Sequence, residues 1–310
     1  MSALLALCGQ WHLVSDADGE IAELYATETD HTHNQHVRQL QPEFSIDIPF
    51  PHNPTAGTRL QTIQIVQNQS AQIKGQCVFS RFCLWDGAVC LAHFLAQHST
   101  HLGLGGAKTI ELGSGSGLVS LSLALHQPAP FSITMTDQES LLKHLARNLA
   151  LHAESHPEPT QRRGAAAASA RSGKRTVGGA RGSFAGSSSP AIEVQELEWA
   201  TAPRDPLARH PALRAIAAAS IAAADDMDSD QQYGWDLVVA SDCVYNEHLV
   251  GPFVTTIVGL LEARTAAAAD DGKGRRTPIA LVCFELRSDL VTLAFLEALQ
   301  VIGGSQLVEV

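Results

Sequence analysis

A glycine-rich turn between an apolar strand and a helix is the part of the sequence best suited to bind a ligand. Residues 109–118 read TIELGSGSGL. Glycine lets a backbone approach a ligand closely and allows positive φ angles. The spacing here is G-x-G-x-G, whereas dinucleotide-binding folds carry G-x-G-x-x-G after their first strand. The spacing therefore disfavours a dinucleotide as the ligand of this turn.

The charges next to the turn indicate which ligand it binds. Glu111 precedes the first glycine. A carboxylate there is a poor neighbour for a pyrophosphate, but a favourable one for a ligand with an ammonium and a sulfonium group. We therefore predict S-adenosylmethionine as the cofactor. Asp137 follows the next predicted strand, where a carboxylate can accept hydrogen bonds from both ribose hydroxyls. The alternative role of Asp137, capping the next helix, does not explain the glycine turn.

A second polar pair follows a later predicted strand. Asp242 and Tyr245 lie in the sequence SDCVY, directly after an apolar run. Open α/β sheets place their ligands at the carboxyl ends of their strands. An Asp-x-x-Tyr pair is common by chance, so its position in the fold is what indicates function. We expect both side chains to face the pocket.

These motifs lie within an alternation of strands and helices. We predict strands over 62–66, 108–112, 131–136, 192–199, 235–240 and 278–285, and helices over 20–25, 86–97, 118–126, 139–151, 249–264 and 290–299. Alternation of this kind is typical of a mainly parallel sheet with helices on both faces. The predicted fold class is α/β with a doubly wound sheet.

Five short segments then occur in a recognisable order. They are WDGA at 85–88, ELGSGSG at 111–117, TD at 136–137, LEW at 197–199 and SDCVY at 241–245. Together they resemble the seven-β-strand protein lysine methyltransferases of the methyltransferase-like family, over residues 70 to 300 without the insertions. The resemblance implies a class I, Rossmann-like methyltransferase fold and N-methylation of a lysine side chain in a protein. Known members modify Hsp70-type chaperones, valosin-containing protein, elongation factors and ribosomal proteins.

The resemblance also implies roles for single residues. The predicted cofactor-binding set, with Glu111 added for its charge, is Trp85, Glu111, Gly113, Ser114, Gly115, Asp137, Trp199 and Ser241. Asp242 is predicted to hold the amine and Tyr245 to wall the acceptor site, as the catalytic pair. Core packing is the alternative role for both tryptophans. Gly87 and Ser241 stand where the family usually has alanine, and neither change is expected to close the pocket.

One further segment resembles the family near the acceptor site. Glu285 and Arg287 form an acidic-x-Arg sequence after the last predicted strand. A surface ion pair of little energetic weight is an equally good interpretation.

The domain organisation follows from composition. We predict an N-terminal extension over 1–74 that packs on a methyltransferase domain over 75–310. Within that domain, 153–191 is rich in Ala, Gly, Ser and Arg without periodicity, which predicts a disordered surface insertion. Smaller insertions are predicted over 201–232 and 265–276. The last residues, 306–310, suffice for one strand, whereas the family fold ends with an antiparallel pair. We expect an incomplete pair, or a terminus that pairs directly with the fifth strand.

Charge and cysteine usage limit the partners. The net charge of −11 argues against stable nucleic-acid binding and suits a cationic protein partner. The six cysteines form no CxxC pair, so neither a zinc site nor a disulfide framework is expected. The histidines at 31, 33 and 36 lie in a polar stretch that predicts a loop and no metal site. No apolar run reaches the length of a membrane span, and the first residues lack the basic region of a signal peptide. We expect a monomer in the cytoplasm and also in the nucleus.

Two other functions remain open at this point. The same cofactor fold could methylate a small molecule or a nucleic acid, although the NPPY-type turn of amide- and adenine-methylating enzymes is absent. It could also serve as a binding or scaffold protein without activity.

Overall fold

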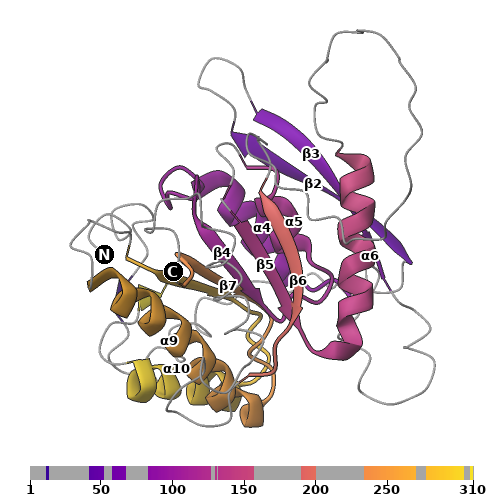
Figure 1. Cartoon of the computed structure of the whole chain (residues 1–310). Helices are drawn as coiled ribbons and strands as arrows, with labels where there is room; N and C mark the ends of the chain where they lie inside the picture. The colour runs from indigo at the N-terminus through magenta and orange to yellow at the C-terminus, as the bar shows by residue number, and fades with distance from the viewer. Residues whose placement is uncertain are drawn as a thin grey trace, which may run out of the picture.

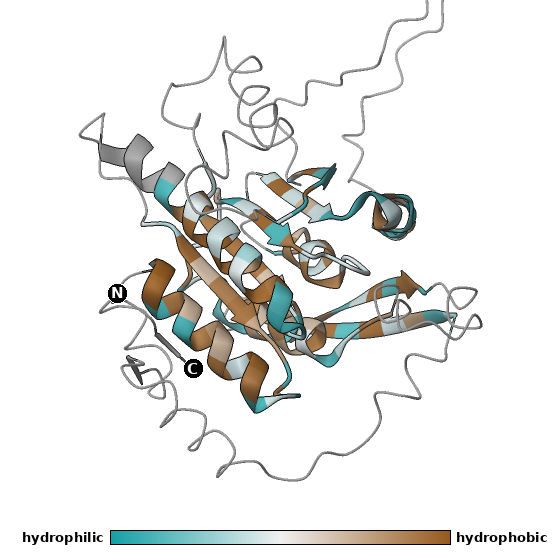
Figure 2. Ribbon diagram, turned by 90° about the horizontal axis from the view of Figure 1, so that it is seen from below, coloured by the Kyte–Doolittle hydropathy of each residue, from teal (hydrophilic) through white to brown (hydrophobic). Residues whose placement is uncertain are grey.

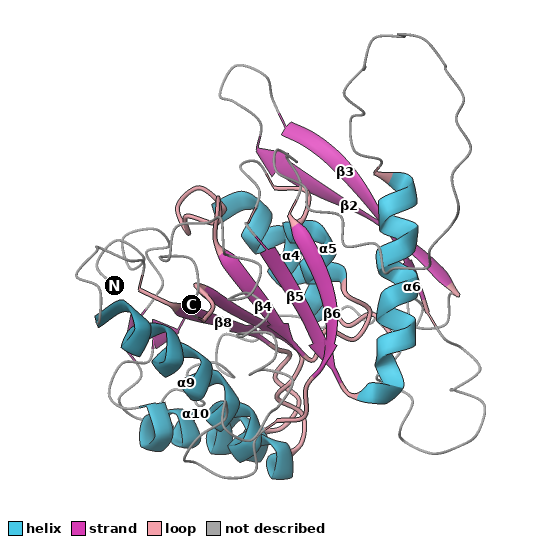
Figure 3. Ribbon diagram, in the orientation of Figure 1, coloured by secondary structure: helices cyan, strands magenta, loops and turns pink. Residues whose placement is uncertain are grey.

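A parallel sheet of five strands forms the centre of the computed structural model (Figure 1, Figure 3). The structure describes residues 12–13, 42–51, 58–67, 83–126, 130, 132–156, 190–199, 234–269, 277–303 and 308–309. The strands are β4 (Lys108–Leu112), β5 (Ser132–Asp137), β6 (Ala191–Glu196), β7 (Leu237–Ser241) and β8 (Ile279–Cys283). They are ordered β6-β5-β4-β7-β8 and every pair is parallel.

The strand order creates a reversal at the middle of the sheet. The chain starts at β4, continues outward to β5 and β6, and then returns to β7 and β8 on the other side of β4. Connections leave β4 and β7 in opposite directions. A crevice outside the carboxyl ends is the expected ligand site of such a sheet. The glycine turn follows β4 and the SDCVY motif follows β7, so both lie at this reversal.

Helices cover both faces of the sheet. The helices α4 (Asp86–His98), α5 (Leu118–Leu123) and α6 (Glu139–Ser155) belong to one side, while α9 (Glu247–Ala269) and α10 (Asp289–Gly303) belong to the other. Side chains alternate accordingly along β7: Leu237 and Val239 join one apolar cluster, Val238 and Ala240 the second. A strand buried on both faces is continuously apolar, as 237–240 is. The predicted doubly wound α/β fold is therefore confirmed.

An antiparallel hairpin lies against the first helical layer. Strands β2 (Glu43–Pro51) and β3 (Thr58–Val66) pair from Glu43 with Val66 to Pro51 with Thr58. Hydrophilic and hydrophobic residues alternate along both strands (Figure 2), and the isoleucines Ile48, Ile63 and Ile65 are fully buried. The Asn148 side chain of α6 accepts a hydrogen bond from Val66 N at 3.0 Å and donates one to Ser116 O at 2.8 Å. Through Asn148, the hairpin is thus tied to the glycine turn.

The strands and helices predicted from 86 onward all occur, with changed ends. The strand expected over 192–199 ends at Glu196, because Leu197 to Trp199 leave the sheet. Helix α9 extends to Ala269, which includes the beginning of the insertion expected over 265–276. The predicted helix 20–25, the histidines 31–36, most of 153–191 and all of 201–232 lie outside the described residues. No helix in the described part is long and apolar enough to cross a membrane.

The C-terminal residues pair differently from the expectation. Strand β9 (Val308–Glu309) pairs antiparallel with β1 (His12–Leu13), not with the fifth strand, β8. Within the described residues, β7 is the sheet partner of β8. A contact with the N-terminal segment could not be derived from the pattern of either end, because both strands are only two residues long.

A buried histidine lies where α5 meets the hairpin. His126 is 0% exposed, and its ring lies edge-on to Phe50 with 5.0 Å between the ring centroids. Neither ring nitrogen has a hydrogen-bond partner among the described residues. Burial lowers the pKa of His126 from 6.5 to about 4, so the ring is neutral at physiological pH.

Acid should therefore weaken the fold through His126. The unfolded chain takes up this proton below about pH 6.5, whereas the folded protein takes it up only near pH 4, so stability falls as the pH drops through this window. His126→Leu should show a smaller loss of Tm between about pH 7.5 and about pH 5 than the wild type. Calorimetric melts measure this. His152, whose pKa is also lowered to about 4, should leave some acid sensitivity. Equal losses in both proteins would show that His126 is not responsible.

Candidate functional site

Hydrogen bonds from the neighbouring strand hold the glycine turn. Ser114 N donates to Thr136 O at 2.9 Å, and Thr136 N donates back to Ser114 Oγ at 3.1 Å. The Thr136 hydroxyl donates to Glu111 O at 2.6 Å. The ends of β4 and β5 are thereby fixed to each other, so the turn has a defined shape beside Asp137.

The turn uses glycine for conformation and for space. Gly113, Gly115 and Gly117 have φ angles of 63°, 52° and 84°, a region that disfavours other residues. A Cβ atom on Gly113 would lie 2.7 Å from Cys243 Sγ and 3.4 Å from Trp199 Cζ2. Three segments that are far apart in the sequence therefore meet at Gly113: the turn, the motif after β7 and the segment after β6.

Glu111 supports this turn from inside the protein. Its side chain is buried, and Oε2 accepts hydrogen bonds from Ser120 N at 3.2 Å and from Ser120 Oγ at 2.5 Å. Burial raises the pKa of Glu111 from 4.5 to about 7, although the hydrogen bonds from Ser120 oppose that shift. The carboxylate thus joins the end of β4 to α5. Its predicted contact with the cofactor stays a prediction, and the contact seen here is with the helix.

Asp137 lies at the turn, at the end of β5. Its Oδ2 accepts a hydrogen bond from Gly115 N at 2.8 Å, and Oδ1 accepts one from Gln138 N at 2.8 Å. The residue before the first turn of α6 is Gln138, and no side chain caps this helix. The contact with Gly115 places the carboxylate beside the glycine turn. Its predicted hydrogen bonds to a ribose stay a prediction.

Asp242 directly follows β7 and has an unusual backbone conformation. Its φ angle is 52°, the one positive value of a non-glycine residue in the described part of the chain. The side chain is 4% exposed. Oδ2 accepts from Gly87 N at 2.7 Å, and Oδ1 accepts from Glu285 N at 3.1 Å and from Arg287 Nη2 at 3.4 Å. Burial raises the pKa of Asp242, against the opposing effects of Glu285 N, Arg287 and Gly87 N. Asp242 therefore links the start of α4 to the segment after β8.

Aromatic and charged side chains surround this carboxylate. The Arg287 guanidinium lies over the Trp85 ring, 4.0 Å from its centroid, and its Nε donates to Glu285 Oε2 at 2.9 Å. The acidic-x-Arg segment is therefore part of the site and more than a surface ion pair. Tyr245, the second predicted catalytic residue, is 42% exposed.

Two contributors to the site were not among the predicted site residues. Cys243 is buried and its thiol donates to Leu112 O at 3.3 Å. Burial, followed by the carboxylates of Asp137, Asp242 and Glu111, raises the pKa of the Cys243 thiol well above its usual range. Cys243 therefore lies within the influence of all three carboxylates. The other is Gly87, whose N–H binds Asp242. A Cβ there would lie 2.8 Å from Asp242 Cγ.

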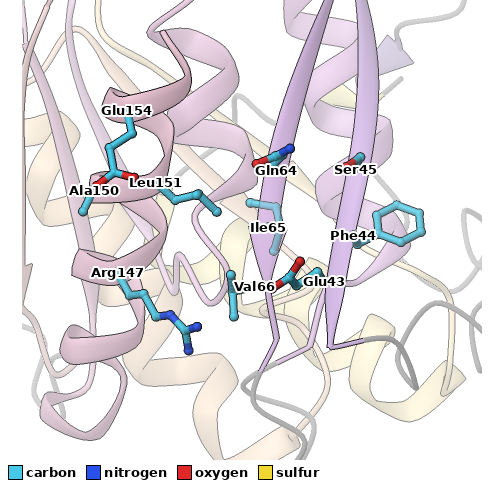
Figure 4. A pocket seen from close by; sticks show the side chains of 10 residues that line it. All are labelled: Glu43, Phe44, Ser45, Gln64, Ile65, Val66, Arg147, Ala150, Leu151 and Glu154. Carbon is cyan, nitrogen blue, oxygen red and sulfur yellow. The ribbon is translucent and has the colours of Figure 1, made fainter. Parts of the chain in front are cut away.

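Predicted residues from five segments thus gather at the carboxyl edge of the sheet. They are Trp85, Gly113, Ser114, Gly115, Asp137, Trp199, Ser241, Asp242 and Tyr245. A separate hollow of about 310 Å³ lies between the hairpin and α6 (Figure 4). Phe44, Ile65 and Leu151 are among its lining residues, and no predicted site residue lines it. Among the described residues, no cluster of His, Cys, Asp and Glu is arranged to hold a metal ion.

The fold and this edge define a class I methyltransferase-like α/β architecture: a glycine turn after the first strand of the sheet and a carboxylate after the second. A family model described as lysine methyltransferase matches residues 65–161. A curated relative, protein N-lysine methyltransferase METTL21A of Danio rerio, is 26% identical over 182 residues, which are 59% of this chain and 56% of the relative. The chain thus spans about half the length of the curated relative it matches. The resemblance to protein lysine methyltransferases is confirmed.

Gly113→Ala should destabilise the protein more than Gly106→Ala. Both glycines have a positive φ, but a Cβ at Gly106 would meet nothing within 4 Å. Gly106→Ala should therefore cost about 1–2 kcal/mol from the backbone alone. Gly113→Ala adds the clash with Cys243, which Cys243→Ala in the same chain should relieve. Urea unfolding measures the free energy of unfolding of the two single variants and of the double variant. Equal losses for both single variants would contradict the close packing at Gly113.

Glu111→Gln should change how stability depends on pH. In the folded wild type this carboxyl holds its proton up to about pH 7, whereas its ordinary pKa is 4.5. The folded state therefore binds more protons within that window, and wild-type stability falls as the pH rises through it. The variant lacks this titration, so its Tm relative to wild type should increase from about pH 4.5 to about pH 7. A Tm difference that stays constant would refute this assignment.

Proposed function

We propose that this protein is an S-adenosylmethionine-dependent protein-lysine N-methyltransferase. The match to the lysine methyltransferase family over 65–161 and the similarity to METTL21A support this function. The observation that carries it is the meeting at Gly113, where the turn after β4 lies against Cys243 of the strand-end motif and against Trp199. One crevice can then serve both a nucleoside and an acceptor.

The residues of this edge suit the cofactor. Trp199 lies beside the glycine turn, since its Cζ2 would be 3.4 Å from a Cβ at Gly113, and a tryptophan offers a flat face for an adenine. A carboxylate can accept about four hydrogen bonds, so the bonds that Asp137 accepts from Gly115 and Gln138 do not exclude ribose hydroxyls as further donors. Ser114, Gly115 and Ser241 complete the proposed lining, with Trp85 at the acceptor side.

The chemistry requires a neutral amine in a closed site. When bound, S-adenosylmethionine supplies a methyl group to the amine nitrogen as the carbon–sulfur bond breaks and its electron pair stays on sulfur. The chain itself contributes alignment and exclusion of water. We propose that Tyr245 forms a wall of the acceptor site, and that the acidic groups near Asp242 attract the protonated lysine. The proton leaves to water before transfer, so no obligate general base is assigned.

The partner and its location follow from the same proposal. We propose that the substrate is a protein with an accessible lysine, which the net charge of −11 helps to attract. We propose a monomer that acts in the cytoplasm and also in the nucleus. Cys83, Cys90, Cys243 and Cys283 are free thiols, which suits a reducing compartment.

Cofactor uptake and methyl transfer should both depend on Asp137. Calorimetric titration of the full chain should detect binding of S-adenosylmethionine. Asp137→Asn should weaken it roughly ten-fold or more, because a hydrogen bond to a charged group is lost. Asp289→Asn, an exposed change in α10, is the control and should bind as the wild type does.

The acceptor is tested with labelled cofactor and cell lysate. A protein band labelled by the wild type and lost with Asp137→Asn would support lysine methylation, once mass spectrometry places the methyl group on lysine. Label confined to RNA or small molecules would replace the proposed acceptor class. Absence of cofactor binding would leave a scaffold function.

A further inference from the structure

Two carboxylates, those of Asp242 and Glu285, lie at the proposed acceptor site, and they differ in their exposure to solvent. The Asp242 side chain is 4% exposed, whereas that of Glu285 is 36% exposed. They follow neighbouring parallel strands, since Ser241 of β7 pairs with Cys283 of β8. An incoming lysine therefore meets Glu285 at the surface, while Asp242 lies beneath it.

The hydrogen bonds of Asp242 indicate that its role is structural. Its oxygens accept from Gly87 N, Glu285 N and Arg287, and its own N–H donates to Cys283 O at 2.7 Å. A lysine ammonium that reached this carboxylate would have to displace donors in a nearly closed space. Leaving a buried N–H without an acceptor is unfavourable. Asp242 is thus better suited to position other groups than to receive the substrate.

Glu285 is held in a fixed direction by the same network. Its backbone N–H is bound by Asp242 Oδ1 at 3.1 Å, and its Oε2 accepts from Arg287 Nε at 2.9 Å. Arg287 is in turn fixed by Asp242 and by the Trp85 ring. A carboxylate can accept about four hydrogen bonds, so an ammonium can bind Glu285 beside Arg287.

The charges of the cluster favour a cation. Asp242 and Glu285 carry two negative charges against the single positive charge of Arg287 when both are ionised. One net negative charge therefore remains in the cluster, whose arginine lies over the Trp85 ring. An ammonium gains from a carboxylate and an aromatic face at one place.

We propose that Glu285 binds the ammonium of the acceptor lysine, and that Asp242 acts through Glu285 by fixing its backbone and, through Arg287, its carboxylate. This inference rests on the proposed function and names the acceptor-binding group of that same site. A carboxylate that holds the ammonium captures the substrate and does not accelerate methyl transfer, because the amine must lose its proton afterwards.

Glu285→Gln is the decisive variant. Gln keeps the size and can still accept from Arg287, but it loses the charge. The acceptor is the lysate fraction that contains the methylated protein. The apparent KM for this acceptor should rise about ten-fold, while kcat changes less than about three-fold. Glu285→Asp should recover part of the KM. Glu297→Gln, which removes an exposed charge from α10, is the matched control and should leave both constants unchanged.

A binding measurement separates this inference from turnover. n-Butylammonium carries the end of a lysine side chain, and n-butanol is its uncharged counterpart. Saturation-transfer NMR on the full-length protein should show n-butylammonium bound more weakly to Glu285→Gln than to the wild type, by about ten-fold in Kd. n-Butanol should show no such difference. Asp242→Asn should lower Tm in addition to weakening n-butylammonium binding, because it weakens the hydrogen bonds that join three chain segments.

Several outcomes would overturn the assignment. Unchanged KM and unchanged n-butylammonium binding in Glu285→Gln would leave Glu285 as a partner of Arg287 only. A large rise of KM in Asp242→Asn without a loss of Tm, together with a normal Glu285→Gln, would make Asp242 the amine-binding group. If the wild type labels no protein, the proposed function fails by itself, and the n-butylammonium comparison still decides the role of Glu285.

Discussion

The buried carboxylate of Asp242 is the interaction on which the acceptor side of this edge depends. It accepts hydrogen bonds from an N–H at the start of α4, from an N–H in the segment after β8 and from the guanidinium of Arg287. No two of these groups are close in sequence except Glu285 and Arg287. A charge that is nearly closed off from water needs such partners, since an isolated buried carboxylate is costly. The requirement to satisfy one aspartate thus fixes the relative positions of three chain segments.

The cofactor side is organised by a second set of contacts with the same logic. The Glu111 carboxylate accepts a hydrogen bond from the Ser120 hydroxyl inside the protein, and the Asp137 carboxylate accepts one from Gly115 N at the glycine turn. The buried Cys243 thiol packs against Gly113, within the influence of all three carboxylates. Both sides of the edge are therefore built from carboxylates bound to backbone N–H groups.

Much of this arrangement could be predicted from the sequence. The apolar run 237–240 and the glycine turn indicated parallel strands with loops at one edge, and the structure has them. The sequence pattern could not show whether the Glu111 carboxylate points into the protein or toward the ligand. That direction depends on Ser120, nine residues along the chain. Nor could it distinguish Asp242 from Glu285 as the accessible acid. Exposure is set by how α4 and β8 come together, and strand periodicity carries no information about that.

The glycine at position 87 limits which sequences can use this network. The related family usually has alanine there, and a methyl group at this position would press on the Asp242 carboxylate. In this chain the missing methyl group lets Gly87 N approach Asp242 Oδ2 to 2.7 Å. Alanine at position 87 would force the carboxylate to shift, and the bonds of Asp242 to Glu285 N and Arg287 would shift with it. One added carbon at the start of α4 would therefore be transmitted to the segment after β8.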